Sequence, residues 1–366
     1  MTIKSKLSVC LIMLACCSCS QTQRTTESES KKEIRITALE IDTVQLSLEE
    51  TSVVGSSVIY KDSLCFLDDY FSYLYPMDAE GQMGNRLLGK GEGPSELPIR
   101  FPLGIAPDPS NNSTLVFLGS SNDFYLYDGN VKRMNMIPDG EPNSYESSSA
   151  YTLWDETILK LSGDNMYYNV IGSSEETSLT DQADYPQHAF IMMKVNLSTG
   201  KMTPAGHFSD TYVKNWDKLI TLPKYYYDSD DQGDFYLSFQ ADSLLYRMDS
   251  DLNVKQAFGF QGTEMETSYY TAGNDLEELG EALQKNLTEK GYYCWIKKVG
   301  KYIFRSYQKS EGKFGLQIYE GTTLIGDVET PSCLKVAGYV SPYFVSEVIF
   351  DEETNTLKFY RFKLDK

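Results

Sequence analysis

Histidine is scarce in this sequence, which limits the catalytic chemistry that can be read from it. The two histidines, His188 and His207, stand in no His-Glu-x-x-His zinc motif, and no Gly-x-Ser-x-Gly nucleophile elbow occurs. A triad with either histidine stays open, because triad members meet in space rather than in sequence. The 52 acidic residues contain too many carboxylate pairs to single one out for glycoside hydrolysis. We therefore assign no catalytic residue, no cofactor and no metal ligand, and the sequence favours a non-catalytic protein.

The sequence also lacks an apolar run long enough to span a bilayer, for which about 20 residues are needed. It has a shorter run instead: Lys4 and Lys6 precede a largely apolar stretch, residues 7–15, that ends in a cluster of cysteines. This order of basic, apolar and small residues is typical of a secretory signal, and the cysteines indicate a lipoprotein signal. Cys19 is the favoured lipid-attachment site, because a small residue precedes it, and Cys17 is the alternative.

These features divide the chain into three parts. We expect a lipoprotein signal peptide at 1–18, a flexible tether at 19–32 rich in Thr, Ser, Glu and Lys, and one folded domain at 33–366. The expected location is the cell envelope, with a lipid anchor in the outer membrane. No acidic run follows Cys19, which favours the periplasmic side.

Basic residues are outnumbered by acidic ones, and the net charge is −19. Loss of Lys4 and Lys6 with the signal would lower it to −21, since no acidic residue leaves with them. Such a field repels nucleic acid and anionic headgroups, so we expect no nucleic-acid partner. An envelope protein or a glycan remains open as the partner, and we expect a monomer.

Few cysteines remain once the signal is removed. Three stay in the folded domain, each in an apolar, strand-like context: Cys65, Cys294 and Cys333. One disulfide is possible, and Cys294 with Cys333 is the preferred pair because both lie in the C-terminal region. The apolar contexts favour buried free thiols over a bridge.

What the sequence has in abundance is short runs of Tyr, Phe, Val, Ile and Leu between Gly, Asp, Asn and Ser clusters, a texture typical of all-β proteins. One element recurs: an alternating aromatic and aliphatic strand that ends, in most copies, in an acidic or amide residue. It occurs at residues 73–78, 124–128, 191–196, 245–249, 316–320 and 357–362. The irregular spacing suits blades of about 45 residues with inserted loops.

Six recurrences predict a six-bladed β-propeller, because four-stranded sheets arranged around an axis cover one another's faces. Residues 34–46 are expected to supply the strand that closes the ring beside the C-terminal strands. A pair of two-sheet sandwich domains would show the same local pattern and is the alternative.

One segment, residues 274–290, breaks the β pattern. Leucines recur there at spacings of three, four and four residues: Leu276, Leu279, Leu283 and Leu287. With Asn274 as an N-cap and Gly291 after its end, the segment is predicted to form one inserted amphipathic helix. It is expected to be a packed cap on one face of the ring or, alternatively, a lid or docking helix.

Residues 88–96 with 102–104 and 124–128, residues 233–249, and residues 304–308 with 324–328 together resemble the TolB-like six-bladed β-propeller lipoproteins of Bacteroides-type bacteria. The family element Gly-Pro-Gly-Glu-Phe reads Gly-Pro-Ser-Glu-Leu here. We expect a structural loop after an outer strand, formed by Gly89, Gly91, Gly93 and Pro94. The resemblance implies a propeller in the cell envelope and transfers no catalytic residue.

Two motifs approach known ligand-binding loops without completing them. Residues 84–91 lack the Ser or Thr that follows the lysine of a phosphate-binding loop, and the nearby Pro94 and Pro98 exclude its helix. Residues 228–234 match the first half of a calcium loop, but Phe239 stands where the bidentate Glu belongs. We interpret both as turns between strands.

Clustered tyrosines give a sharper binding hypothesis, because aromatic rings stack on the apolar faces of sugars. The candidates for lining a central funnel are Tyr225, Tyr226, Tyr227, Tyr292 and Tyr293, although such residues also pack between blades. The leading hypothesis is a membrane-tethered, non-catalytic binding or scaffolding lipoprotein whose propeller face engages a protein or a glycan. The alternative is a carbohydrate-active hydrolase or lyase with carboxylates in the central pocket.

Overall fold

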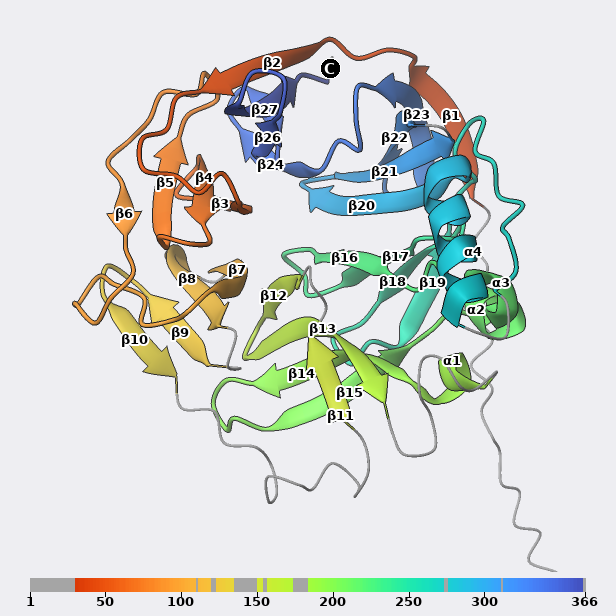
Figure 1. The fold of residues 1–366 in the computed structure, drawn as a ribbon, viewed down its shortest axis with the longest axis horizontal. Coiled ribbons are helices and arrows are strands. Elements are labelled where there is room, and N and C mark those ends of the chain that lie inside the picture. Colours follow the sequence, from red (N-terminus) through yellow and green to blue (C-terminus); the bar gives the residue numbers. More distant parts are fainter. Residues whose placement is uncertain are drawn as a thin grey trace, which may run out of the picture.

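The chain folds into six β-sheets set around a central axis, a six-bladed β-propeller (Figure 1). The computed structural model describes residues 30–109, 111–119, 123–134, 150–153, 157–173, 184–272, 276–310 and 312–364. The all-β, six-bladed prediction is confirmed, and the pair of sandwich domains is excluded. The expected signal peptide and all but the last residues of the tether, with Cys17 and Cys19, lie outside the described residues.

The first three blades follow one another along the chain. Blade 1 contains β3 (Gly55–Tyr60), β4 (Ser63–Asp68), β5 (Tyr73–Met77) and β6 (Leu87–Leu88). Blade 2 contains β7 (Pro102–Asp108), β8 (Asn111–Gly119), β9 (Phe124–Tyr127) and β10 (Val131–Met134). Blade 3 contains β12 (Leu159–Ser162), β13 (Asn165–Ser173), β14 (Phe190–Asn196) and β15 (Met202–His207), and β11 (Ala150–Leu153) pairs with the end of β13.

The remaining blades include both N-terminal strands. Blade 4 contains β16 (Tyr225–Ser229), β17 (Phe235–Phe239), β18 (Leu245–Met248) and β19 (Val254–Phe258). Blade 5 contains β20 (Tyr292–Val299), β21 (Tyr302–Ser310), β22 (Lys313–Glu320) and β23 (Thr323–Thr330), with β1 (Lys31–Ile36) parallel to β23. Blade 6 contains β24 (Val336–Val340), β25 (Tyr343–Ser346), β26 (Ile349–Asp351), β27 (Thr356–Phe362) and β2 (Ile41–Leu46).

The recurrent sequence element is the third strand of every blade: β5, β9, β14, β18, β22 and β27. In four blades an Asp or Asn at its end caps the turn to the fourth strand: Asp78, Asp128, Asn196 and Asp249. Asp78 Oδ1 accepts hydrogen bonds from the backbone N–H groups of Glu80 and Gln82, at 2.9 and 2.8 Å. Asp249 Oδ1 accepts two in the same way. In these blades the repeat therefore marks the turn between the third and fourth strands, which is capped by the oxygen of a short side chain.

The ring closes as the sequence predicts. Strand β2 pairs antiparallel with β27 over six residue pairs, so that the N-terminal part of the chain completes the C-terminal blade. The first part of the predicted closing segment behaves differently, because β1 joins the edge of blade 5 instead. Strand β1 also begins at Lys31, two residues before the expected start of the domain.

The apolar core is a ring of interfaces between neighbouring blades. One cluster joins blades 6 and 1 through Leu46, Phe66 and Phe359, and further clusters fill the other interfaces. Strands in the middle of a blade, such as β17 and β21, are buried along almost their whole length because a neighbouring blade covers each face. The outer strand β10 is only partly covered.

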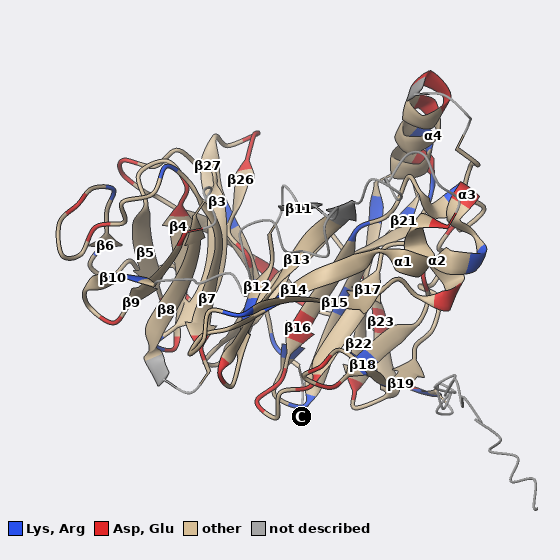
Figure 2. Cartoon of the chain, turned by 90° about the horizontal axis from the view of Figure 1, so that it is seen from below, with Lys and Arg blue, Asp and Glu red and all other residues tan. Residues whose placement is uncertain are grey.

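One face of the propeller carries all four described helices, and we call it the helix face. Strands alternate in direction within a blade, so connections from second to third strands and from one blade to the next share a face. These connections hold α1 (Tyr185–His188), α2 (Asp210–Lys214), α3 (Trp216–Leu219) and α4 (Leu276–Glu289), and α4 projects farthest (Figure 2). Among the described residues, no helix is long and apolar enough to cross a membrane.

Helix α4 lies where the leucine spacing predicts it, but the predicted apolar stripe is only partly covered. Leu283 is 39 % exposed, whereas Ala282 and Asn286 are buried. Asn286 attaches the helix: its amide donates to Thr221 Oγ1 at 2.8 Å, and its carbonyl accepts from the backbone N–H of Tyr270. The expected N-cap, Asn274, lies outside the described residues. Helices α1 to α3 were not predicted, since four or five residues are too few for a 3.6-residue period to emerge.

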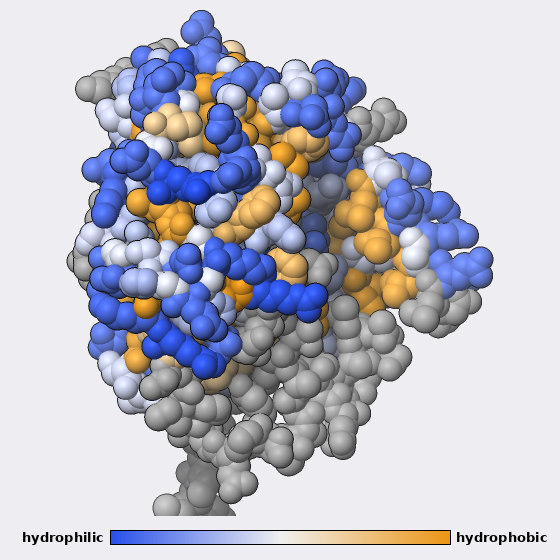
Figure 3. Space-filling model, turned by 60° about the vertical axis from the view of Figure 1, so that its left-hand side comes forward, coloured by the Kyte–Doolittle hydropathy of each residue, from blue (hydrophilic) through white to orange (hydrophobic). Residues whose placement is uncertain are grey.

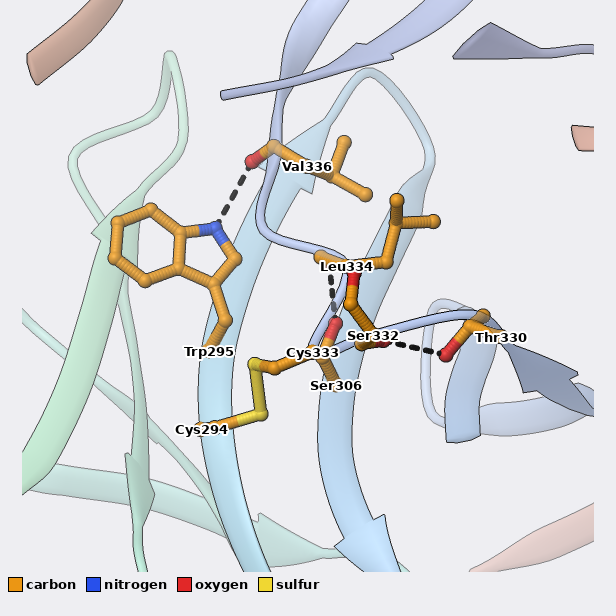
Figure 4. Close-up of a disulfide and its surroundings, with 8 residues drawn as sticks. All are labelled: Cys294, Trp295, Ser306, Thr330, Ser332, Cys333, Leu334 and Val336. Atoms are coloured by element: carbon orange, nitrogen blue, oxygen red, sulfur yellow. Dashed lines mark hydrogen bonds between the residues drawn. A yellow bond between two sulfur atoms is a disulfide. The ribbon is translucent and has the colours of Figure 1, made fainter. Parts of the chain in front are cut away.

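The preference for free thiols is wrong for two of the three cysteines. Cys294 of β20 and Cys333, in the connection between β23 and β24, form a disulfide that links blades 5 and 6 (Figure 4). This is the pair that the sequence favours for a bridge. Cys65 is a buried free thiol, and burial raises its pKa to about 12.

A central cavity with two lysines around one aspartate

A cavity of about 1030 Å³ occupies the centre of the propeller. Its walls are the first strands of all six blades, β3, β7, β12, β16, β20 and β24, which lie side by side around the axis. The cavity also reaches the loops that precede these strands, which lie on the helix face, and the loops that follow them on the opposite face, through Pro109, Asp231 and Gly300. A cavity of this size admits a small molecule or one end of a longer one.

Three charged side chains from three neighbouring blades meet in the cavity wall. Lys160 Nζ of β12 lies 2.6 Å from Asp228 Oδ1 of β16, and Lys297 Nζ of β20 lies 3.4 Å from Asp228 Oδ2. The side chain of Asp228 is 5 % exposed, and those of Lys160 and Lys297 are 18 % and 22 % exposed. We call these three residues the lysine–aspartate cluster.

The cluster carries one positive charge too many. Burial alone would raise the pKa of Asp228, but both ammonium groups and the backbone N–H of Lys298 outweigh it, so the pKa lies below its usual value. Burial lowers the pKa of Lys297 to about 8, against the attraction of Asp228 and with added repulsion from Lys160. Lys297 is therefore protonated at neutral pH but poorly compensated. An anion entering the cavity would supply the missing charge.

Other titratable groups stand nearer the mouth of the cavity. The pKa of Asp69, in the turn between β4 and β5, is raised to about 6 by burial and by the neighbouring Asp68. Lys335 lies 5.1 Å above the ring of Trp295, whose Nε1–H donates to the carbonyl of Val336 (Figure 4). Because Trp295 follows Cys294, the disulfide fixes this part of the wall.

The five tyrosines proposed as ligand-lining residues do not line this cavity. Tyr225 and Tyr227 donate hydrogen bonds to carbonyl groups of blade 3, and Tyr226 packs against Trp295. The ring of Tyr293 lies under the buried guanidinium of Arg305 and borders a smaller cavity beside α3. Tyr292, next to it in β20, is partly exposed. The rings that border the central cavity belong to Tyr70, Phe101, Trp295 and Tyr339.

The predicted glycine and proline loop lies directly after β6. The backbone N–H of Gly93 donates to Glu96 Oε2, and a Cβ at Gly91 would stand 2.0 Å from the same oxygen. Pro94 accepts a hydrogen bond from the backbone N–H of Val131, which ties the loop to the outer strand of blade 2. Gly89 accepts a backbone hydrogen bond from Leu97 and so completes the turn.

The remaining motifs are placed apart from one another. His188 ends α1 and His207 ends β15, both outside the lining of the central cavity. In the acidic stretch 228–234, Asp230 caps the turn between β16 and β17, and Asp234 pairs with Arg247 and Lys255. Within the described ranges, no group of three or more His, Cys, Asp or Glu could hold a metal ion.

Sequence reasoning missed Lys160 and Lys297. Lys160 is the one lysine of β12, and Lys297 is followed by Lys298 in β20. Each lies 68 or 69 residues from Asp228 in the chain, so no local motif links them. The available signal was their place in the first strand of a blade, where a lysine faces the axis. A lysine can be assigned to a first strand only after the boundaries of the blades are known.

Comparisons with known proteins agree with the fold. The chain is similar to a member of the DUF4221 family from Bacteroides vulgatus, with a TM-score of 0.64 and 14 % identity over 92 % of this chain and 99 % of that one. At this identity, the likeness shows the propeller fold alone. No family model matches the sequence, and no curated protein matches it.

Two further structures are more distantly similar. One is a protein described as exported, from Bacteroides fragilis, with a TM-score of 0.48 and 16 % identity over 91 % of this chain and 99 % of that one. The other is a virginiamycin B lyase from Staphylococcus aureus, with a TM-score of 0.42 and 9 % identity over 89 % of this chain and all of that one. Likenesses this weak carry no argument about activity.

Proposed function

We propose that this protein is a non-catalytic binding lipoprotein of the cell envelope whose central cavity captures a small carboxylate-bearing ligand. The observation that carries the proposal is the lysine–aspartate cluster, in which two ammonium groups share one carboxylate in a largely buried part of the cavity wall. The chain as a whole has a net charge of −19. A local positive excess inside an acidic protein needs a reason, and a ligand carboxylate supplies one. With the ligand bound, the two ammonium groups would face two carboxylates instead of the single carboxylate of Asp228.

The envelope location and the lipid anchor at Cys19 belong to the same proposal. Their support is the basic, apolar and cysteine-containing order of residues 1–19 and the resemblance to TolB-like lipoproteins. The Cys294–Cys333 disulfide is consistent with them, because disulfides persist in oxidising compartments such as the periplasm. Replacement of Cys19 by Ala should release the protein from the membrane fraction into the soluble periplasm.

A carbohydrate-active enzyme is the second candidate, and Asp69 is the observation in its favour. A carboxyl with a pKa of about 6 suits a general acid. Its partner would have to be a second carboxylate. Asp228 is engaged by two lysines and the backbone N–H of Lys298, whereas Asp108, Asp231 and Glu347 also line the cavity. We rank binding first because the lysine–aspartate cluster is a charged site already assembled in the cavity wall.

The test uses changes of opposite charge sign in the same cluster. Isothermal titration with glucuronate and succinate, with glucose as the neutral control, should show binding of the anions alone. Lys160→Met and Lys297→Met should each weaken binding about tenfold or more, whereas Asp228→Asn should strengthen it. Lys301→Met, which removes a lysine that is 61 % exposed on the outer surface, is the control for net charge.

Two results would overturn the proposal. One is equal affinity of the wild-type protein for the anions and for glucose, including no affinity for any of them. The other is loss of binding in Asp228→Asn, which would make the aspartate rather than the lysines the ligand-contacting group. Turnover of a uronide that ceases in Asp69→Asn would instead support the enzyme.

A further inference from the structure

The mouth of the central cavity carries apolar side chains that the fold leaves uncovered. Val54, Tyr70 and Phe101 are 61 %, 56 % and 37 % exposed, and all three border the cavity. Val54 and Phe101 each precede the first strand of a blade, and Tyr70 lies between the second and third strands of blade 1. All three therefore lie on the helix face. Exposed apolar residues that gather at a cavity mouth indicate a binding surface.

This surface is held in place by a buried carboxylate. Asp68, which is fully buried, accepts hydrogen bonds from the backbone N–H groups of Tyr70 and Phe71, at 2.9 and 2.8 Å. It also accepts bonds from the side chain of Thr51 and from both the backbone and the side chain of Ser52. The segments that carry Val54 and Tyr70 are thus fixed to one another before any ligand arrives, which lowers the entropy cost of binding.

A lysine lies between the two aromatic rings. Lys90 Nζ is 5.3 Å from the ring centroid of Tyr70 and 5.2 Å from that of Phe101. It donates to the backbone carbonyl groups of Arg100 and Tyr70, at 2.8 and 3.4 Å. An ammonium group has three donors, so within the described part of the chain one N–H of Lys90 remains for a ligand. We call Tyr70, Lys90 and Phe101 the mouth platform.

The chemistry of the mouth platform differs from that of the cavity wall. Flat rings offer stacking area to a partly apolar ring, and the ammonium group between them offers an ion pair to a carboxylate on that ring. Deeper in the cavity, the lysine–aspartate cluster offers a second site for a carboxylate. A ligand that uses both needs rings with an apolar face and anionic groups repeated along its length.

We infer that the ligand of this cavity is an acidic oligosaccharide, with one uronate unit at the lysine–aspartate cluster and a following unit stacked on the mouth platform. This inference rests on the proposed function, because it takes the cluster as the anion site. It goes further by assigning Tyr70, Lys90 and Phe101 as a second subsite and by naming the ligand class. A chain of such sugars would enter from the helix face, where the mouth platform lies.

The test measures the gain in affinity from monomer to trimer. Isothermal titration of the full-length chain with galacturonate and with a galacturonate trimer should show the trimer binding at least tenfold more tightly. Tyr70→Ala and Phe101→Ala should reduce that gain to about twofold or less, and Lys90→Met should reduce it partly. Phe350→Ala removes an aromatic side chain with the same 37 % exposure but outside the cavity lining, and should keep the gain.

The outcomes separate this inference from the proposed function. An unchanged gain in Tyr70→Ala and Phe101→Ala, with binding still lost in Lys297→Met, would overturn the mouth platform and leave the anion site standing. Binding of succinate without any binding of galacturonate would overturn the sugar class alone. Equal binding of a neutral galactose trimer would overturn both. Because Tyr70 and Phe101 are exposed, their truncation should leave the thermal midpoint of the propeller within about 2 °C.

Discussion

Lys297 makes the affinity for an anion depend on pH in a defined window. Its pKa in the free protein is about 8, and a bound carboxylate would raise it, so the anion binds the protonated form more tightly. We expect the affinity for glucuronate to fall about tenfold between pH 7 and pH 9.5, a range in which Asp69, with a pKa of about 6, is already ionised. Titration calorimetry across this range would check it. The Lys297→Met variant should show a much flatter profile, and an equally steep fall in that variant would assign the effect to another group.

Lys297 should also lower the free energy of unfolding of the ligand-free protein. The folded pKa of about 8 lies below the ordinary value of 10.5, so between these pH values the unfolded chain holds more protons and stability rises with pH. Below about pH 8 the penalty is present in full. We therefore expect Lys297→Met to raise the free energy of unfolding at pH 7 by roughly 1 to 2 kcal/mol, measured by urea denaturation. Destabilisation of similar size would mean that Lys297 is a structural ion-pair partner.

At the scale of structural elements, one disulfide links blades 5 and 6 covalently. It joins Cys294 and Cys333 across a sequence separation of 39, and closing a loop of that length stabilises a fold by about 4 kcal/mol in the chain-entropy treatment. We expect the double variant Cys294→Ala, Cys333→Ala to unfold at a urea concentration lower by the corresponding amount. Cys65→Ala, which removes the buried free thiol, is the matched control for loss of a sulfur. Equal losses in both variants would show that packing, not the bridge, sets the effect.

Helix α4 depends on one buried amide. Asn286 makes hydrogen bonds to Thr221 and to both backbone groups of Tyr270. Most residues of the helix are exposed, and the side of the molecule drawn in Figure 3 is likewise largely hydrophilic, with smaller apolar patches. Replacement by Leu keeps the volume but leaves these groups unpaired. We expect Asn286→Leu to raise hydrogen exchange in α4 and residues 267–272 with little change in the blades. Gln284→Leu, at an exposed position of the same helix, should change neither.

The difference between α4 and the third strands shows which features of the structure could be predicted from the sequence. An alternating aromatic and aliphatic third strand leaves a local mark, strengthened in four blades by a turn-capping Asp or Asn, so six copies could be counted and the fold predicted. Asn286 and Lys297 leave none, because each is a polar residue whose partners come from other elements. The leucine spacing located α4, but it did not predict that Asn286 attaches the helix or that Leu283 of the predicted stripe is exposed. The lysine–aspartate cluster was not predicted because its three residues come from three different blades and form no motif in the sequence.

At the scale of the whole molecule, the chain enters the propeller away from the cavity mouth. Lys31 pairs with Thr323 beside the turn between β22 and β23, which lies on the face opposite the helix face. Were residues 19–30 the flexible tether that the sequence predicts, their mean span would be about 20 Å, and a lipid anchor at Cys19 would leave the helix face pointing away from the membrane. With the protein anchored in vesicles, a quencher attached to the lipid headgroups should reduce the fluorescence of a label at position 301 more than that of a label at position 281 of α4. Equal quenching would mean that the tether lets the propeller tumble freely.

The last prediction concerns the closure of the ring. Of the strands that the structure describes, a chain that begins at residue 40 lacks only β1, which is almost wholly exposed at the edge of blade 5, and it should lose little stability. A chain that begins at residue 47 also lacks β2, which exposes the edge of β27 and removes the buried Leu46 from the interface of blades 6 and 1. We expect the thermal midpoint to fall by roughly 10 °C or more for the second chain, followed by circular dichroism. A synthetic peptide of residues 38–48 should restore part of the loss, because β2 is held by pairing with β27 and by burial rather than by its covalent place. An equal loss in both truncated chains would show instead that β1, and not β2, closes the propeller.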